Sequence, residues 1–104
     1  MITAIVTAKI PQGMTKEQYL EHAQRIAGRF QAIPGLIRKQ FLFSDEQGAA
    51  GGVYLWESRA AADACYAGVW RDNFKAAFGA EPQIAFFDSP VVVDNEAHTV
   101  KVAA

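Results

Sequence analysis

Apolar side chains fill both halves of the alternating pattern at residues 51–58, which run directly into an alanine-rich segment. Alternation predicts a strand here, with Tyr54 and Trp56 on one face and Val53 and Leu55 on the other. Both faces of this strand must therefore be covered. In a chain of this length helices can cover one face, and a second copy of the chain is expected to cover the other.

Similar patterns predict four strands in total, at residues 2–9, 36–44, 51–57 and 83–88. Turn-forming residues at 45–48 make the second and third strands a hairpin, and Lys39 and Phe41 share one face of the second strand. Pro90 ends the fourth strand. The C-terminal extension, residues 91–104, contains two candidate short strands, at 91–93 and 99–102.

Two helices are predicted between these strands. The first follows a capping-box pattern formed by Thr15 and Gln18, and the second follows Ser58 as N-cap. The second helix is expected to kink or break at Gly68 and to end at Gly79. Apolar residues on one arc of the first helix are Tyr19, Leu20, Ala23, Ile26, Ala27 and Phe30.

The resulting order, βαββαβ, is that of the ferredoxin-like fold, an α+β class with an antiparallel sheet and both helices on one face. We expect a single domain over residues 1–104, with residues 91–104 as an extension. The helix-free face carries too many apolar residues for contact with water. Two sheets packed through this face would close a dimeric α+β barrel, so a homodimer is expected.

Ten basic and eleven acidic residues give a net charge of −1, and no charge run is present. Nucleic acid and membrane surfaces are therefore not expected as partners. No apolar run approaches the roughly 20 residues that a bilayer requires. Cys65 is the single cysteine, and the N-terminus lacks a secretory pattern, so the expected compartment is the cytoplasm.

Several motifs resemble the YdhR-type monooxygenases of the dimeric α+β barrel superfamily, which includes the antibiotic-biosynthesis monooxygenases. They are Pro34-Gly35-Leu36, Lys39 with Phe41, the strand at 50–57 with its alanine-rich helix, and Phe87-Asp88-Ser89-Pro90. The similarity spans residues 2 to about 94. It implies the dimeric barrel and a homodimer. It also implies oxidation of polycyclic aromatic compounds without metal, flavin or haem.

The sequence contains no pattern typical of a metal site or a phosphate-binding loop. His22 and His98 are the only histidines and lie in unrelated segments, so no metal site is expected. Gly51 and Gly52 precede a strand instead of joining a strand to a helix, which does not fit a phosphate-binding loop. We therefore expect no cofactor.

Aromatic residues are the strongest site signal, either as the lining of a cleft for a flat apolar ligand or as plain core. Trp56 and Trp70 are favoured as site residues because a buried indole N–H needs a partner. Asn73, one turn beyond Trp70, is a hydrogen-bond candidate or simply an exposed polar residue. The predicted substrate-binding set is Phe41, Tyr54, Trp56, Tyr66, Trp70, Asn73, Phe74 and Phe78, with Phe30 as a further candidate.

Two residues are candidates for catalysis. His22 lies at the edge of the apolar arc and could accept a phenolic proton, or it could be a half-exposed helix histidine. Lys39 could stabilise a phenolate or enolate, or it could be a rim or interface lysine paired with Asp88. Cys65 is interpreted as a small buried hydrophobic residue.

The first functional hypothesis is a cofactor-independent monooxygenase that oxidises an aromatic or polyketide-like small molecule with dioxygen. The alternative is a non-catalytic dimer that binds a small apolar ligand or acts in a stress response. A third interpretation, haem binding or degradation, needs an axial ligand, for which only His22 and His98 are available.

Overall fold

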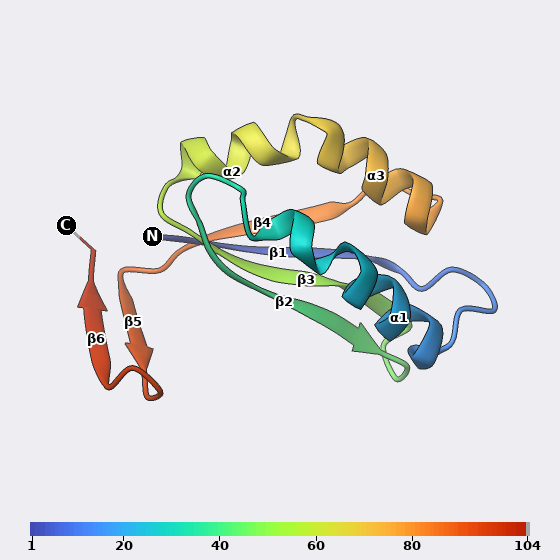
Figure 1. Cartoon of the computed structure of the whole chain (residues 1–104), viewed down its shortest axis with the longest axis horizontal. Coiled ribbons are helices and arrows are strands. Elements are labelled where there is room, and N and C mark those ends of the chain that lie inside the picture. Colours follow the sequence, from blue (N-terminus) through green and yellow to red (C-terminus); the bar gives the residue numbers. More distant parts are fainter. Residues whose placement is uncertain (104) are drawn as a thin grey trace.

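A four-stranded antiparallel sheet carries all the helices on one face (Figure 1). The computed structural model describes residues 1–103. The strands are β1 (Ile2–Lys9), β2 (Leu36–Ser44), β3 (Ala49–Trp56) and β4 (Gln83–Asp88), in the order β2-β3-β1-β4. This order, with the βαββαβ sequence of elements, is that of the ferredoxin-like fold. The predicted α+β class and fold are confirmed.

The helices begin where the capping residues were predicted. Thr15 and Gln18 form a reciprocal capping box at the start of α1 (Lys16–Ile26). Ser58 caps α2 (Arg59–Tyr66), and the predicted break at Gly68 separates it from α3 (Val69–Phe78). No helix within residues 1–103 is long and apolar enough to cross a membrane.

The first helix differs from the prediction in its last turn. The α-helix ends at Ile26, and η1 (Ala27–Phe30) continues as a tighter 3₁₀ turn. Gly28 lies inside this turn, and glycine has low helix propensity. The change of winding places Arg29 and Phe30 beside β2, where they take part in the pocket described below.

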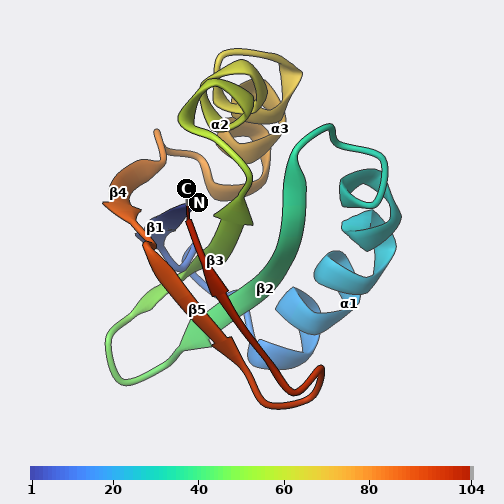
Figure 2. The ribbon, with the colours of Figure 1, turned by 90° about the vertical axis from the view of Figure 1, so that its left-hand side faces the viewer.

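The two candidate C-terminal strands pair with each other as a separate hairpin, β5 (Val91–Asp94) and β6 (Thr99–Val102). The hairpin projects beyond one end of the main sheet (Figures 1 and 2). An ion pair of 2.8 Å between Arg38 and Asp94 ties it to β2. Four valines on one hairpin face are more than half exposed, namely Val91, Val93, Val100 and Val102.

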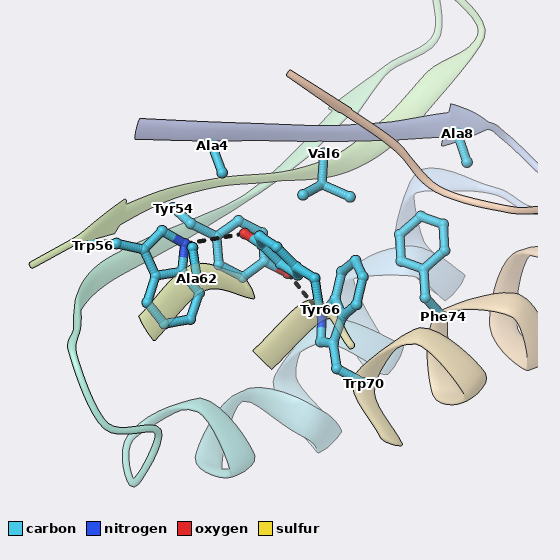
Figure 3. Packing of buried hydrophobic residues seen from close by; sticks show 9 residues of the cluster. All are labelled: Ala4, Val6, Ala8, Tyr54, Trp56, Ala62, Tyr66, Trp70 and Phe74. Carbon is cyan, nitrogen blue, oxygen red and sulfur yellow. Dashed lines mark hydrogen bonds between the residues drawn. The ribbon is translucent and has the colours of Figure 1, made fainter. Parts of the chain in front are cut away.

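The core lies between the sheet and the α2–α3 pair (Figure 3). Small side chains on β1, including Ala4 and Ala8, leave room for large aromatic residues of β3 and the helices. Two buried indoles are satisfied by tyrosines: Trp56 Nε1 donates to Tyr66 Oη and Trp70 Nε1 donates to Tyr54 Oη, both at 3.1 Å. The aromatic core therefore leaves neither indole N–H without a partner.

The opposite face of the sheet is covered by no helix, and it carries an apolar patch beside polar residues such as Arg38 and Gln40. Ile5 pairs with Val53 on one side and Ala85 on the other, which builds an apolar row across three strands. Phe87 is 55% exposed, although it lies on the same face. Leu42 and Leu55 extend the surface toward β2. An apolar area of this kind usually marks an interface.

Candidate active site

A pocket opens on the helix-covered face, between α1 with η1 on one side and α3 on the other. Figure 2 shows α1 and the α2–α3 pair standing apart over the sheet. The cavity has a volume of about 240 Å³, and β2 and β3 form its floor. It is lined by Tyr19, His22, Ile26, Arg29, Phe30, Ile33, Lys39, Phe41, Gly51, Tyr54, Val69, Trp70, Asn73, Phe74, Ala77 and Phe78.

Both candidate catalytic residues, His22 and Lys39, line this pocket. So do most of the predicted substrate-binding residues, namely Phe41, Tyr54, Trp70, Asn73, Phe74 and Phe78. These side chains come from α1, β2, β3 and α3, and only the tertiary structure brings them together.

Two of the predicted substrate-binding residues, Trp56 and Tyr66, do not belong to the lining of this pocket. Trp56 is completely buried, and its indole N–H is taken up by the Tyr66 hydroxyl. The indole N–H of Trp70 also has a partner within the protein, because it donates to Tyr54 Oη. Neither buried indole therefore needs a ligand as its hydrogen-bond acceptor. Trp70 offers a ligand its ring surface.

The Lys39 amine lies inside a cage of aromatic rings. Its Nζ is 3.3 Å from the ring centroid of Phe30, 3.8 Å from that of Phe41 and 4.7 Å from that of Tyr54. Ring faces stabilise the ammonium form. Burial opposes this effect and lowers the pKa of Lys39 from 10.5 to about 7. A substantial share of Lys39 is therefore a neutral amine near neutral pH.

The absence of a side chain at Gly52 leaves room for the Lys39 side chain to lie against β3. A Cβ atom at this position would lie 3.0 Å from Lys39 Cε and 3.2 Å from Tyr54 Cε1. The proposed partner Asp88 lies on β4, at the opposite edge of the sheet from β2. Lys39 therefore does not pair with Asp88 within one chain.

His22 is half-buried at the rim of the pocket. Burial lowers the pKa of its imidazole, and the positive charges of Arg25, Arg29 and Lys39 lower this pKa further. The imidazole is therefore mostly neutral at neutral pH, as a base must be. The imidazole of His22 is therefore a second possible proton acceptor in the same cavity, besides the Lys39 amine.

The hydroxyls of the two tyrosines in the lining, Tyr19 and Tyr54, each make a hydrogen bond within the protein. Tyr19 Oη donates to the backbone carbonyl of Gly51 at 2.7 Å. Burial raises the pKa of Tyr54 and keeps its hydroxyl protonated. The other polar side chains of the lining are those of His22, Arg29, Lys39 and Asn73, and Asn73 is exposed.

Arg29 was not predicted as a site residue. His22, Ile26 and Arg29 follow each other at spacings of four and three residues, which places them on one helical face. This spacing could have identified Arg29 as a site residue from the sequence, since Ile26 had been assigned to the apolar arc and His22 to its edge.

No group of His, Cys, Asp and Glu side chains suited to holding a metal ion occurs within residues 1–103. His98 lies in the turn between β5 and β6, outside the pocket lining. Of the two histidines proposed as axial haem ligands, only His22 belongs to this lining.

Residues 6–88 match the model of the protein family described as "Putative mono-oxygenase ydhR". The chain belongs to this family. The match confirms the resemblance seen in the sequence motifs and covers all four strands of the main sheet except the first residues of β1. No curated protein sequence matches the chain.

Several solved structures share the fold of this chain. A MhuD variant with two manganese protoporphyrin IX molecules per active site has a TM-score of 0.67, with 19% identity over 90% of this chain and 99% of that chain. The structure named "Putative antibiotic biosynthesis monooxygenase from Nitrosomonas europaea" has a TM-score of 0.63. It is 20% identical over 86% of this chain and 98% of that chain.

A monooxygenase from the gene ActVA-Orf6 of Streptomyces coelicolor, in complex with nanaomycin D, has a TM-score of 0.63. It is 21% identical over 85% of this chain and 86% of that chain. At these identities the similarity establishes the fold. Two of the three structures are named with a bound molecule, manganese protoporphyrin IX in one and nanaomycin D in the other.

Proposed function

We propose that this member of the YdhR family is a cofactor-independent monooxygenase that oxidises an aromatic or polyketide-like molecule with dioxygen. The observation that carries the proposal is the Lys39 amine, held in an aromatic pocket with its pKa lowered to about 7 by burial. A neutral amine in a water-poor pocket is a competent general base. Once protonated, it becomes a cation facing the anion that it has formed.

The reaction suits a substrate such as an anthrone, whose ring-flanked methylene carbon is acidic. Lys39 Nζ accepts a proton from this carbon, and the resulting ammonium stabilises the enolate oxygen. The enolate transfers one electron to dioxygen, and the resulting radical and superoxide combine in a C–O bond. The peroxide anion then takes the proton back from the Lys39 ammonium to give a hydroperoxide, which restores the neutral amine. Loss of water breaks the O–O bond and leaves a ketone. One oxygen atom enters the product and the other leaves as water.

The aromatic walls support this chemistry by orienting a flat substrate. Trp70 and Phe74 present their rings from α3, while Phe30 and Phe41 close the side around Lys39. An apolar enclosure strengthens the attraction between the ammonium and the enolate, because little water competes for either charge.

Dioxygen uptake with purified protein and a panel of anthrones and hydroquinones, without added cofactor, tests this proposal. We expect uptake above the spontaneous rate for at least one ring system, with one equivalent of oxygenated product. Binding of one or more compounds with no uptake for any member of the panel would contradict the proposal. That result would favour the non-catalytic dimer that binds an apolar ligand.

We further propose that two chains pack through the helix-free face of the sheet to form a homodimer. The support is the apolar row through Ile5, with Phe87 beside it and more than half exposed in the single chain. A second copy offers the same surface, so a twofold interface would match apolar residues to apolar residues.

Replacing Phe87 with aspartate is expected to weaken the dimer at least about 30-fold, because a charge would be buried in the interface. Sedimentation velocity over a concentration series measures this change. Leu20→Asp is the matched control, since Leu20 is equally exposed at 55% but lies on α1. A monomeric parent protein, or equal weakening by both variants, would contradict the proposed interface.

A further inference from the structure

The pocket lining contains three basic side chains, His22, Arg29 and Lys39, and no aspartate or glutamate. The chain as a whole has a net charge of −1, so this basic lining does not follow from a basic composition. Arg29 supplies a permanent positive charge among the three. A cavity of this kind attracts a ligand that is apolar in its body and negative at one point.

Arg29 stands out among the arginines of the chain. The other four are each within 4 Å of a carboxylate: Arg25 pairs with Glu21, Arg38 with Asp94, Arg59 with Asp63 and Arg71 with Glu81. Within residues 1–103, Arg29 has no such partner. A guanidinium is suited to bind a carboxylate through two parallel hydrogen bonds.

The position of Arg29 separates it from Lys39. Arg29 lies in η1 and is exposed, at the solvent side of the cavity, whereas Lys39 lies on the floor among the rings of Phe30, Phe41 and Tyr54. The positive charge of Arg29 also reaches His22, whose pKa it lowers. The pocket thus has an exposed cation and a buried amine, and aromatic rings belong to the same lining.

We propose that the natural substrate is an aromatic carboxylic acid whose carboxylate is bound by Arg29 at the pocket mouth. Its fused rings would lie on the aromatic walls, with the reacting carbon directed inward to Lys39. This assignment rests on the proposed oxygenation, and it narrows the substrate class from neutral aromatics to acids. The cavity of about 240 Å³ favours a compact ring system.

Three probes of one shape test the proposal: 2-naphthoate, 2-naphthamide and 2-naphthylmethylammonium, which are negative, neutral and positive. Equilibrium dialysis without any turnover measures their dissociation constants. We expect 2-naphthoate to bind about tenfold more tightly than the amide and the cation to bind most weakly. High salt should reduce the preference for the acid.

Arg29→Gln should remove most of the preference for 2-naphthoate over the amide while leaving binding of the amide unchanged. Arg29→Lys should retain part of the preference, because it keeps the charge but not the paired donors. Arg25→Gln is the matched control, since Arg25 lies one turn earlier, outside this pocket, and pairs with Glu21.

Equal binding of the acid and the amide by the parent protein would overturn the proposal, as would failure of all three probes to bind. A preference that survives in Arg29→Gln but disappears in Lys39→Met would also overturn it, because the carboxylate would then lie at the inner end. Each of these results concerns binding alone. Failure of the proposed oxygenation would appear instead as absent dioxygen uptake.

Discussion

Replacing Gly51 with alanine is expected to lower the free energy of unfolding by about 3–5 kcal/mol. A Cβ atom at this position would lie 1.9 Å from the carbonyl oxygen of Val6 on the neighbouring strand. The backbone of Gly51 also has φ +155, which residues with a side chain rarely adopt. Relief of the clash would require β1 and β3 to separate at the centre of the sheet.

Urea unfolding followed by tryptophan fluorescence measures this loss, because both tryptophans lie in or beside the core. Gly28→Ala is the matched control. It places the same methyl group in open space in the 3₁₀ turn, so a change of less than about 1 kcal/mol is expected. A loss below about 1 kcal/mol for Gly51→Ala would contradict the close approach of the two strands.

Replacing Lys39 with methionine is expected to reduce the rate of dioxygen uptake at least about 100-fold, the usual contribution of a general base. Methionine fills a similar volume among the rings of Phe30, Phe41 and Tyr54 but accepts no proton. The ligand should still bind, so kcat should fall far more than KM changes. Oxygen-electrode kinetics together with equilibrium binding separate the two effects.

The pH dependence of the parent protein should identify the base. The pKa of Lys39 is lowered to about 7, so the neutral amine increases as the pH rises through 7. Uptake should increase over the same interval and then level off. Lys39→Arg keeps the positive charge but supplies no base at neutral pH, and it should be as slow as Lys39→Met. A profile that shifts only in His22→Gln would assign the base to His22.

The same pKa predicts a change of stability with pH. Between pH 7 and the ordinary pKa of 10.5, Lys39 is mostly protonated in the unfolded chain and mostly neutral in the folded protein. The unfolded state binds more protons, so the folded state should gain stability as the pH rises through this window. Lys39→Met should lack this gain relative to the parent protein.

Local patterns in the chain were sufficient to predict the elements of the fold. Caps act within a few residues, so Thr15, Gln18 and Ser58 could be assigned as helix starts from the sequence alone. Gly68 likewise marked the break between the later helices. Apolar residues on both faces of residues 51–57 indicated a sheet with two covered sides. The ferredoxin-like order followed from these elements.

Which aromatic residues line the cavity depended on contacts between distant segments. Trp56 and Trp70 look alike as buried tryptophans in the sequence, yet only Trp70 faces the pocket. The difference arises because Trp56 packs beneath α2 and Trp70 lies on α3, across from α1. No local pattern contains the distance between two helices that come from distant segments and cover the same face of a sheet.

Periodicity, caps and motifs act along one segment at a time, so they were enough to predict the strands, the starts of the helices, the fold and the family. The lowered pKa of Lys39 and the place of Arg29 in the pocket lining depend on contacts between segments and could not be predicted in this way. A lysine pKa falls when rings from η1 and β3 exclude water around it. Such exclusion exists only after the segments have packed together.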